Sequence, residues 1–146
     1  MTFLQAVSPG PKTLRMYKGP GNLNGLGNSH NIVKDMAPDA AMDPAAFIND
    51  ALVVSYDSEP YSANLFGQIT WNSGNTPRVE CRIVRNGSTL VTGTRITTRD
   101  VPATASTTIT VQPGDSFELW WLGEGSFFQR PVLLAGQNTF LRIEPV

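Results

Sequence analysis

The clearest structural signal in this chain is residues 78–91, which read RVECRIVRNGSTLV. In the first half Val79, Cys81 and Ile83 alternate with charged residues, which predicts a strand with one face toward a core and the other toward solvent. Asn86-Gly87 then favours a tight type I′ turn, because both central positions of that turn need positive φ. The stretch therefore predicts a β-hairpin.

The same pattern of short β-prone runs between turn residues continues in both directions from this hairpin. Evenly spaced short strands are typical of an all-β sandwich or barrel, and about eight of them fit an antiparallel jelly-roll β-sandwich. Gly67 lies inside one run, where we expect a β-bulge. The runs expected to form strands are residues 52–56, 64–71, 78–85, 89–94, 107–111, 117–122, 132–134 and 139–144.

The N-terminal third has a different character. Residues 19–28 read GPGNLNGLGN, which contains many backbone breakers and no apolar period. We therefore expect residues 1–50 to form an extended docking arm and residues 51–146 to form the jelly-roll head. The scattered hydrophobic residues expected to bind a neighbouring protein are Leu14, Tyr17, Leu23 and Leu26.

One short helix is expected at the end of this arm, near residues 44–50. Asp43 suits the N-cap position, where its side chain can accept a hydrogen bond from a free backbone N–H. Pro44 suits the first helical position, because proline has no N–H to leave unsatisfied there.

Length and composition fit one domain with a core of its own: 146 residues, of which 40% are hydrophobic. Only 16% of the residues are charged, against about a quarter in an average protein, and the net charge is −1. This balance gives no reason to expect nucleic-acid binding. No apolar run reaches the length of a membrane helix, and Met1–Val7 lacks the basic start of a signal peptide, so we expect cytoplasmic synthesis without membrane insertion.

We find no set of residues that would support catalysis, a cofactor or a metal ion. His30 is the only histidine and Cys81 the only cysteine, and the two lie far apart in the sequence. A metal site needs several ligands at fixed spacing, and a Cys–His nucleophile also needs an oxyanion hole. Cys81 falls on the apolar phase of its strand, as a small hydrophobic residue would. We therefore expect a protein without enzymatic activity.

Two adjacent tryptophans suggest a functional surface. Neighbouring side chains of a strand point to opposite faces, so one of the pair is expected in the core and the other outside. The outward aromatic side chain has two open interpretations: a contact between subunits, or a platform on which a sugar stacks. The residues expected at a subunit interface are Trp120, Trp121, Phe127 and Phe128.

A series of motifs in the last two thirds of the chain carries a family resemblance. They are the hairpin unit Val79–Val91, the Thr-rich run Thr107–Val111, and Pro113-Gly114-Asp115 leading into Phe117-Glu118-Leu119-Trp120-Trp121. Together they resemble the globular heads of the tumour-necrosis-factor and complement-q superfamily. In those heads a Gly-Asp turn likewise opens a central aromatic strand, and the chain ends on an apolar strand, here residues 140–143. The resemblance implies a jelly roll that packs as a homotrimer.

The chain as a whole, with its breaker-rich start, β head and few charges, is similar to minor tail and decoration proteins of long-tailed bacteriophages, particularly those of actinobacteria. This resemblance implies a structural virion protein, first a minor tail or tail-tip protein, that docks through residues 1–50 on other virion proteins and forms a homotrimer or symmetric ring. A capsid decoration protein is the first alternative. A carbohydrate-binding or trimeric ligand module is the second. A host cell-surface glycan is a further expected partner.

Overall fold

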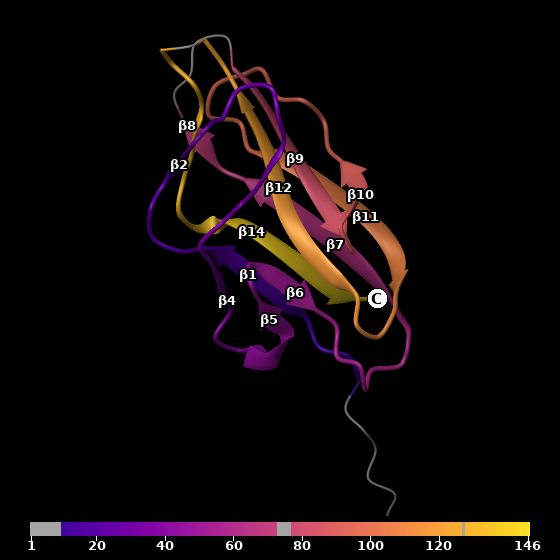
Figure 1. The fold of residues 1–146 in the computed structure, drawn as a ribbon. Coiled ribbons are helices and arrows are strands. Elements are labelled where there is room, and N and C mark those ends of the chain that lie inside the picture. Colours follow the sequence, from indigo (N-terminus) through magenta and orange to yellow (C-terminus); the bar gives the residue numbers. More distant parts are fainter. Residues whose placement is uncertain (1–9, 73–76, 127) are drawn as a thin grey trace, which may run out of the picture.

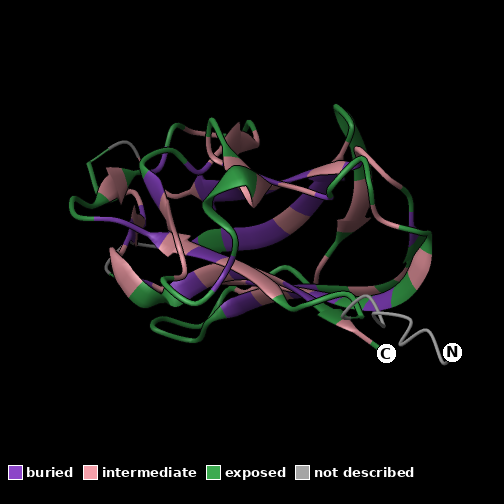
Figure 2. Cartoon of the chain, turned by 90° about the horizontal axis from the view of Figure 1, so that it is seen from below, coloured by how far each residue is buried: buried purple, intermediate pink, exposed green. Residues whose placement is uncertain are grey.

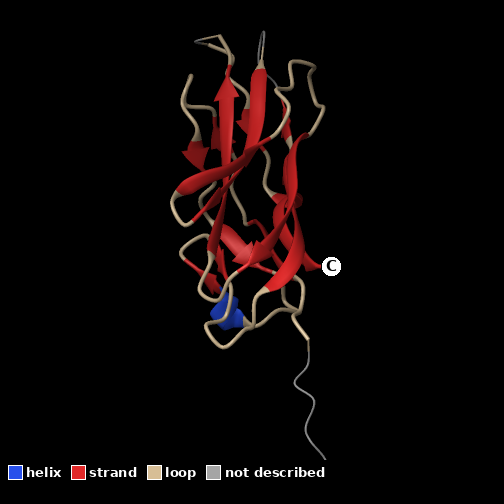
Figure 3. Cartoon of the chain, turned by 90° about the vertical axis from the view of Figure 1, so that its right-hand side faces the viewer, coloured by secondary structure: helices blue, strands red, loops and turns tan. Residues whose placement is uncertain are grey.

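The computed structural model describes residues 10–72, 77–126 and 128–146, and it is built almost entirely from antiparallel strands (Figure 1). Figure 3 shows its short 3-10 helix, η1 (Pro44–Ala46), in the lower part of the view. The strands are β1 (Leu14–Lys18), β2 (Leu23–Asn24), β3 (Asn31–Ile32), β4 (Met36–Pro38), β5 (Phe47–Ile48), β6 (Ala51–Val53), β7 (Tyr61–Ile69), β8 (Trp71–Asn72), β9 (Arg78–Arg85), β10 (Ser88–Thr92), β11 (Ala103–Val111), β12 (Ser116–Glu124), β13 (Val132–Leu133) and β14 (Gly136–Pro145).

Two large sheets face each other as the layers of a sandwich, and the buried positions of Figure 2 lie along the strands of both layers. The first, called here the β7 sheet, has the strand order β11-β7-β14-β1-β4. The second, the β12 sheet, has the order β10-β9-β12-β6-β5, and β3 also pairs with β12. A small sheet of β2, β13 and β8 lies at the upper left in Figure 1. The architecture confirms the all-β antiparallel jelly roll.

The core lies between the inner faces of the two sheets. Leu65 of β7 and Leu141 of β14 are almost or completely buried on one side, and Ile83, Phe117 and Leu119 are completely buried on the other. Burying a side chain of this size contributes about 1.5–3 kcal/mol, so the alternating strands supply most of the driving force for folding.

Each of the eight runs expected to form strands contains one, and residues 78–85 match β9. Two runs differ from the expectation: residues 54–56 lie outside β6, and the run 64–71 is divided between β7 and β8. The turn after β9 has φ of 50° at Asn86 and 81° at Gly87, as a type I′ hairpin requires. The β-bulge expected at Gly67 is not formed, because β7 keeps an unbroken register there with both of its neighbours, β11 and β14. A Cβ at Gly67 would lie 2.9 Å from Leu119 and 3.1 Å from the sulfur of Cys81, so the glycine allows the two sheets to approach closely.

The N-terminal segment differs from the expected separate arm. From residue 14 onward it packs into the sandwich: β1 lies inside the β7 sheet, between β14 and β4. Met16 and Val33 are completely buried in the core. The glycine-rich residues 19–28 are a connection between strands of the same head. A boundary at residue 51 therefore does not separate two structural units.

The helix expected near residues 44–50 is present but limited to η1. The carboxylate of Asp43 caps it by accepting a hydrogen bond from the Ala45 N–H at 2.9 Å. The chain leaves the helix at Phe47 because residues 47–48 form β5, which pairs with β6. Strand pairing therefore replaces the remaining helical turn.

Candidate functional site

The two tryptophans of β12 lie on opposite faces of their sheet. Trp121 is 3% exposed and belongs to the core, while Trp120 is half-buried on the outer face. Trp120 pairs with Arg82 of β9 and with Ile32 of β3, and its indole N–H donates to the Glu118 carboxylate at 3.3 Å. These neighbours on both sides hold the Trp120 ring in one orientation.

The connection between β1 and β4 builds a pocket around Trp120. Figure 1 shows this indigo-to-violet segment, which includes β2, crossing in front of β12, and β3 pairs with β12 at that crossing. The pocket has a volume of about 540 Å³. Its apolar wall consists of Leu23, Leu26 and Ile32 together with the two tryptophans. We call it the Trp120 pocket.

Amide side chains and one cation complete the lining of the Trp120 pocket: Asn22, Asn24, Asn31 and Lys34. The Asn22 oxygen accepts a hydrogen bond from the Ala135 N–H at 2.9 Å, and the Asn31 amide donates to the Ser29 carbonyl at 3.0 Å. Both side chains are thus oriented by the protein itself. The pocket combines a fixed aromatic ring with several groups that donate and accept hydrogen bonds.

The residues expected to dock on a partner fall into two groups. Leu14 and Tyr17 lie in β1, where they pair with Ile143 and Phe140 of β14. Leu23 is half-buried and Leu26 is 65% exposed, and both line the Trp120 pocket. The pairing of β3 with β12 therefore brings two expected docking residues beside an expected interface residue, a juxtaposition that sequence reasoning missed.

The residues expected at a subunit interface are dispersed. Trp121 is buried in the core of its own chain, so its side chain is inaccessible to a second subunit. Phe128 is 91% exposed in the loop after β12 and is not among the side chains that line the Trp120 pocket. Phe127 lies outside the described residues.

A second candidate surface covers the outer face of the β7 sheet. The rings of Phe66 and Phe140 lie 5.7 Å apart, and the Arg142 guanidinium lies 5.7 Å from the centre of each ring. Arg15 lies 4.7 Å from the Phe140 ring and 5.9 Å from the Tyr17 ring. We call these five half-buried residues the aromatic face. In β7 and β14 its members alternate with buried neighbours such as Leu65 and Leu141.

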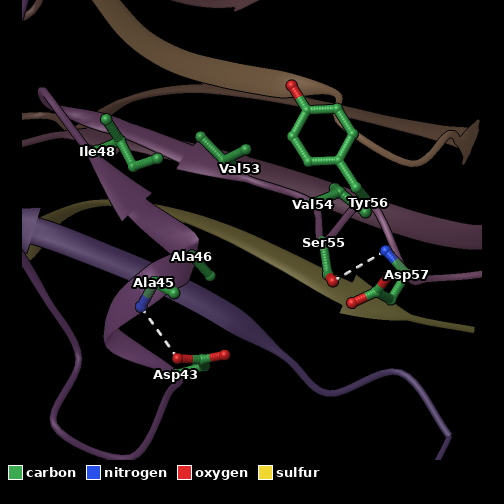
Figure 4. Close-up of a pocket in the computed structure, with 9 residues that line it drawn as sticks. All are labelled: Asp43, Ala45, Ala46, Ile48, Val53, Val54, Ser55, Tyr56 and Asp57. Atoms are coloured by element: carbon green, nitrogen blue, oxygen red, sulfur yellow. Dashed lines mark hydrogen bonds between the residues drawn. The ribbon is translucent and has the colours of Figure 1, made fainter.

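A smaller pocket of about 260 Å³ lies beside η1 and the end of β6 (Figure 4). Ile48 and Tyr56, which are 51% and 82% exposed, line it together with Val53. Asp43 lines it as well, and its carboxylate already accepts the capping hydrogen bond from Ala45. The pocket is open and mainly apolar.

His30 lies next to a buried carboxylate. Its Nε2 atom is 3.9 Å from Glu80, which is 8% exposed and also accepts a hydrogen bond from Arg95 at 3.3 Å. Burial, together with the positive charges of Arg82 and Arg95, lowers the pKa of His30, although Glu80 acts in the opposite direction. His30 is therefore mainly neutral at pH 7. In the described part of the chain, no group of three or more His, Cys, Asp and Glu side chains could hold a metal ion.

Cys81 is expected to be unreactive while the protein is folded. Its side chain is completely buried, and this burial raises the pKa of the thiol well above its usual range, despite a hydrogen bond with the backbone of Ala105. Since the thiolate is the reactive form, a disulfide reagent at pH 8 should label no thiol in the native protein and one in guanidinium. Rapid labelling of the native protein would contradict the buried position.

Comparison with solved structures finds chains of similar fold. Eiger TNF from S. frugiperda superposes with a TM-score of 0.63 at 10% identity, over 92% of this chain and 92% of that chain. The chain has a TNF-like jelly-roll fold. Murine APRIL gives a TM-score of 0.59 at 12% identity, over 92% and 98% of the two chains. Pika GITRL gives 0.50 at 15% identity, over 93% and 97%.

At these identities the likeness concerns the fold alone. No protein-family model matches the sequence, and no curated protein does. In the residues that the structure describes, no helix is long and apolar enough to cross a membrane.

Proposed function

We propose that this protein is a non-enzymatic head that associates with copies of itself, as a homotrimer or symmetric ring, through the aromatic face. The observation that carries the proposal is the composition of this surface. Three aromatic rings and two arginines cover the middle of the β7 sheet. Aromatic residues and arginine are enriched at the centre of protein interfaces, whereas most charged residues are depleted there.

The strand beside the aromatic face supports the same use. The outward side chains of β11 include Thr104, Ser106, Thr108 and Thr110, which are uncharged and small. A strand face of small uncharged side chains can approach a second copy closely at little desolvation cost. The proposal thus places the subunit contact on the β7 sheet, in place of the β12 residues expected from sequence.

Phe140→Asp is expected to convert the assembly into monomers. The variant removes the central ring of the aromatic face, which lies beside Phe66, Arg15 and Arg142, and an aromatic side chain at the centre of an interface typically contributes about 2 kcal/mol or more. Sedimentation at micromolar concentration measures the change in mass, and circular dichroism tests whether the monomer is still folded.

Leu26→Asp is the matched control, because it places the same carboxylate on the exposed wall of the Trp120 pocket. If Leu26→Asp dissociates the assembly and Phe140→Asp does not, the contact lies on the β12 sheet. A wild-type protein that sediments as a monomer at all concentrations overturns self-association altogether.

For this assembled head we further propose a structural role in a tailed-bacteriophage virion, as a minor tail protein at the tail tip. The low share of charged residues, 16% of the chain, and the uncharged outward face of β11 support this role, because they suit a protein that is packed into a larger assembly. An antibody against the protein, applied to purified particles and viewed by electron microscopy, should label the tail tip. Label over the capsid would identify a decoration protein, and particles without the protein would overturn the virion role.

A further inference from the structure

We propose that the Trp120 pocket is a binding site for a pyranose sugar of a glycan. The site is built by the β12 sheet and the connection between β1 and β4, and it lies on the opposite layer of the sandwich from the aromatic face. An assembly that uses the aromatic face would leave this pocket exposed to the surroundings. The inference itself does not depend on self-association.

The first argument is the fixed ring of Trp120. A pyranose ring has a face of C–H groups, and this face packs well against a flat aromatic surface that stays in place. Cross-strand neighbours on both sides and the hydrogen bond to Glu118 hold the indole of Trp120. Leu23 and Leu26 beside it extend the apolar surface.

The second argument is the set of amides around the ring. A sugar hydroxyl both donates and accepts hydrogen bonds, and so does an asparagine amide, which makes the two complementary. Within the described residues, the Asn24 side chain, the nitrogen of Asn22 and the oxygen of Asn31 have no hydrogen-bond partner in the protein. These atoms are therefore available to vicinal hydroxyls. Lys34 adds a cation that an acidic sugar could also use.

The third argument is that the pocket is already formed. The Gly25 N–H donates to the Pro131 carbonyl at 2.8 Å, and a Cβ at Gly25 would lie only 2.1 Å from the Gly123 carbonyl oxygen. The connection therefore lies directly against the end of β12 and cannot move outward without losing these contacts. A volume of about 540 Å³ falls within the roughly 300–1,000 Å³ of small-molecule sites. Because the site is preformed, ligand binding loses little free energy in ordering the chain.

An oligosaccharide array tests the proposal with the full-length protein. The array presents terminal glucose, galactose, mannose, N-acetylglucosamine and glucuronic acid, and the sugar that binds best is then titrated. Binding should raise or shift tryptophan fluorescence, because Trp120 is the half-buried member of the three tryptophans. The proposal expects saturable binding of at least one of these sugars.

Trp120→Ala should weaken binding at least about tenfold. Trp120→Phe should weaken it less, because a smaller aromatic face remains. Asn24→Ala should reduce affinity severalfold without removing any described hydrogen bond of the fold. Tyr56→Ala is the matched control, since it removes an exposed aromatic side chain from the pocket beside η1 and should leave sugar binding unchanged.

The outcomes separate this site from self-association. Trp120→Ala should still melt cooperatively, at a somewhat lower temperature, and should sediment as the wild type does, so that lost binding cannot come from unfolding or dissociation. If no sugar binds, or if folded Trp120→Ala and Trp120→Phe bind as the wild type does, the glycan site is overturned. A monomeric protein that still binds sugar through Trp120 would overturn self-association alone.

Discussion

Removal of residues 1–40 is expected to leave the chain unfolded or aggregated. The deletion takes β1 out of the β7 sheet and leaves the whole edge of β14 without its partner. It also removes Met16, Val33 and Met36 from the core, each worth about 1.5–3 kcal/mol. Domains of this size are stable by only about 5–15 kcal/mol in total, so the loss approaches the whole stability. The truncated chain should lack a cooperative thermal transition in circular dichroism.

Two point variants test whether the truncated chain unfolds because it loses core side chains. Met16→Ala should lower the free energy of unfolding by about 2–5 kcal/mol, because it leaves a cavity in a fully buried position. Leu26→Ala, in the same segment but 65% exposed, should change it by less than about 0.5 kcal/mol. A truncated chain that melts cooperatively near the temperature of the full chain would restore the interpretation of residues 1–50 as a separate arm.

The strands of the head could be predicted because their signals are local. Residues 78–91 contain both the alternation of β9 and the turn residues that bring β10 back beside it. β1 could not be predicted in this way. Its sequence LRMYK has no strict alternation, and its partner β14 lies at the other end of the chain, so that Arg15 contacts Gln137. Only tertiary pairing makes this segment a strand.

The candidate sites show the same limit. The opposite orientation of Trp120 and Trp121 follows from strand geometry and could be stated in advance. The Trp120 pocket depends on where the connection from β1 to β4 runs, and no local pattern in residues 19–34 shows that it crosses the outer face of β12. The aromatic face likewise forms only because Phe66 and Phe140 belong to neighbouring strands.

The turn before β12 contains a buried carboxylate with several partners. Asp115 is 6% exposed, and one of its oxygens accepts hydrogen bonds from the Arg85 guanidinium at 2.6 Å and the Gln112 N–H at 2.8 Å. The other oxygen accepts from the Asn86 amide at 2.9 Å. Asp115 therefore joins this turn to the β9–β10 hairpin, and two turns predicted from sequence stabilise each other.

Asp115→Ala is expected to lower the free energy of unfolding by about 3 kcal/mol, because it leaves Arg85 and the two other donors without their acceptor. Asp115→Asn should lower the free energy of unfolding by less, since the amide oxygen can still accept a hydrogen bond from one of these donors. Chemical denaturation at pH 7 measures both values. Asp57→Asn is the control, because it makes the same change at an exposed position.

The loss of stability caused by Asp115→Asn should become smaller as the pH falls. Burial works against the charged carboxylate, but the hydrogen bonds from Gln112, Asn86 and Arg85 outweigh it and hold the pKa of Asp115 below its usual range. A carboxylate whose pKa is lower in the folded state stabilises the protein above its unfolded pKa of about 3.9, and this contribution is lost as the pH falls through the folded pKa. The difference in stability between wild type and Asp115→Asn should therefore be constant between about pH 5 and pH 7 and decrease toward about pH 2. A difference that grows on acidification would show that Asp115 is not held in its charged form by these donors.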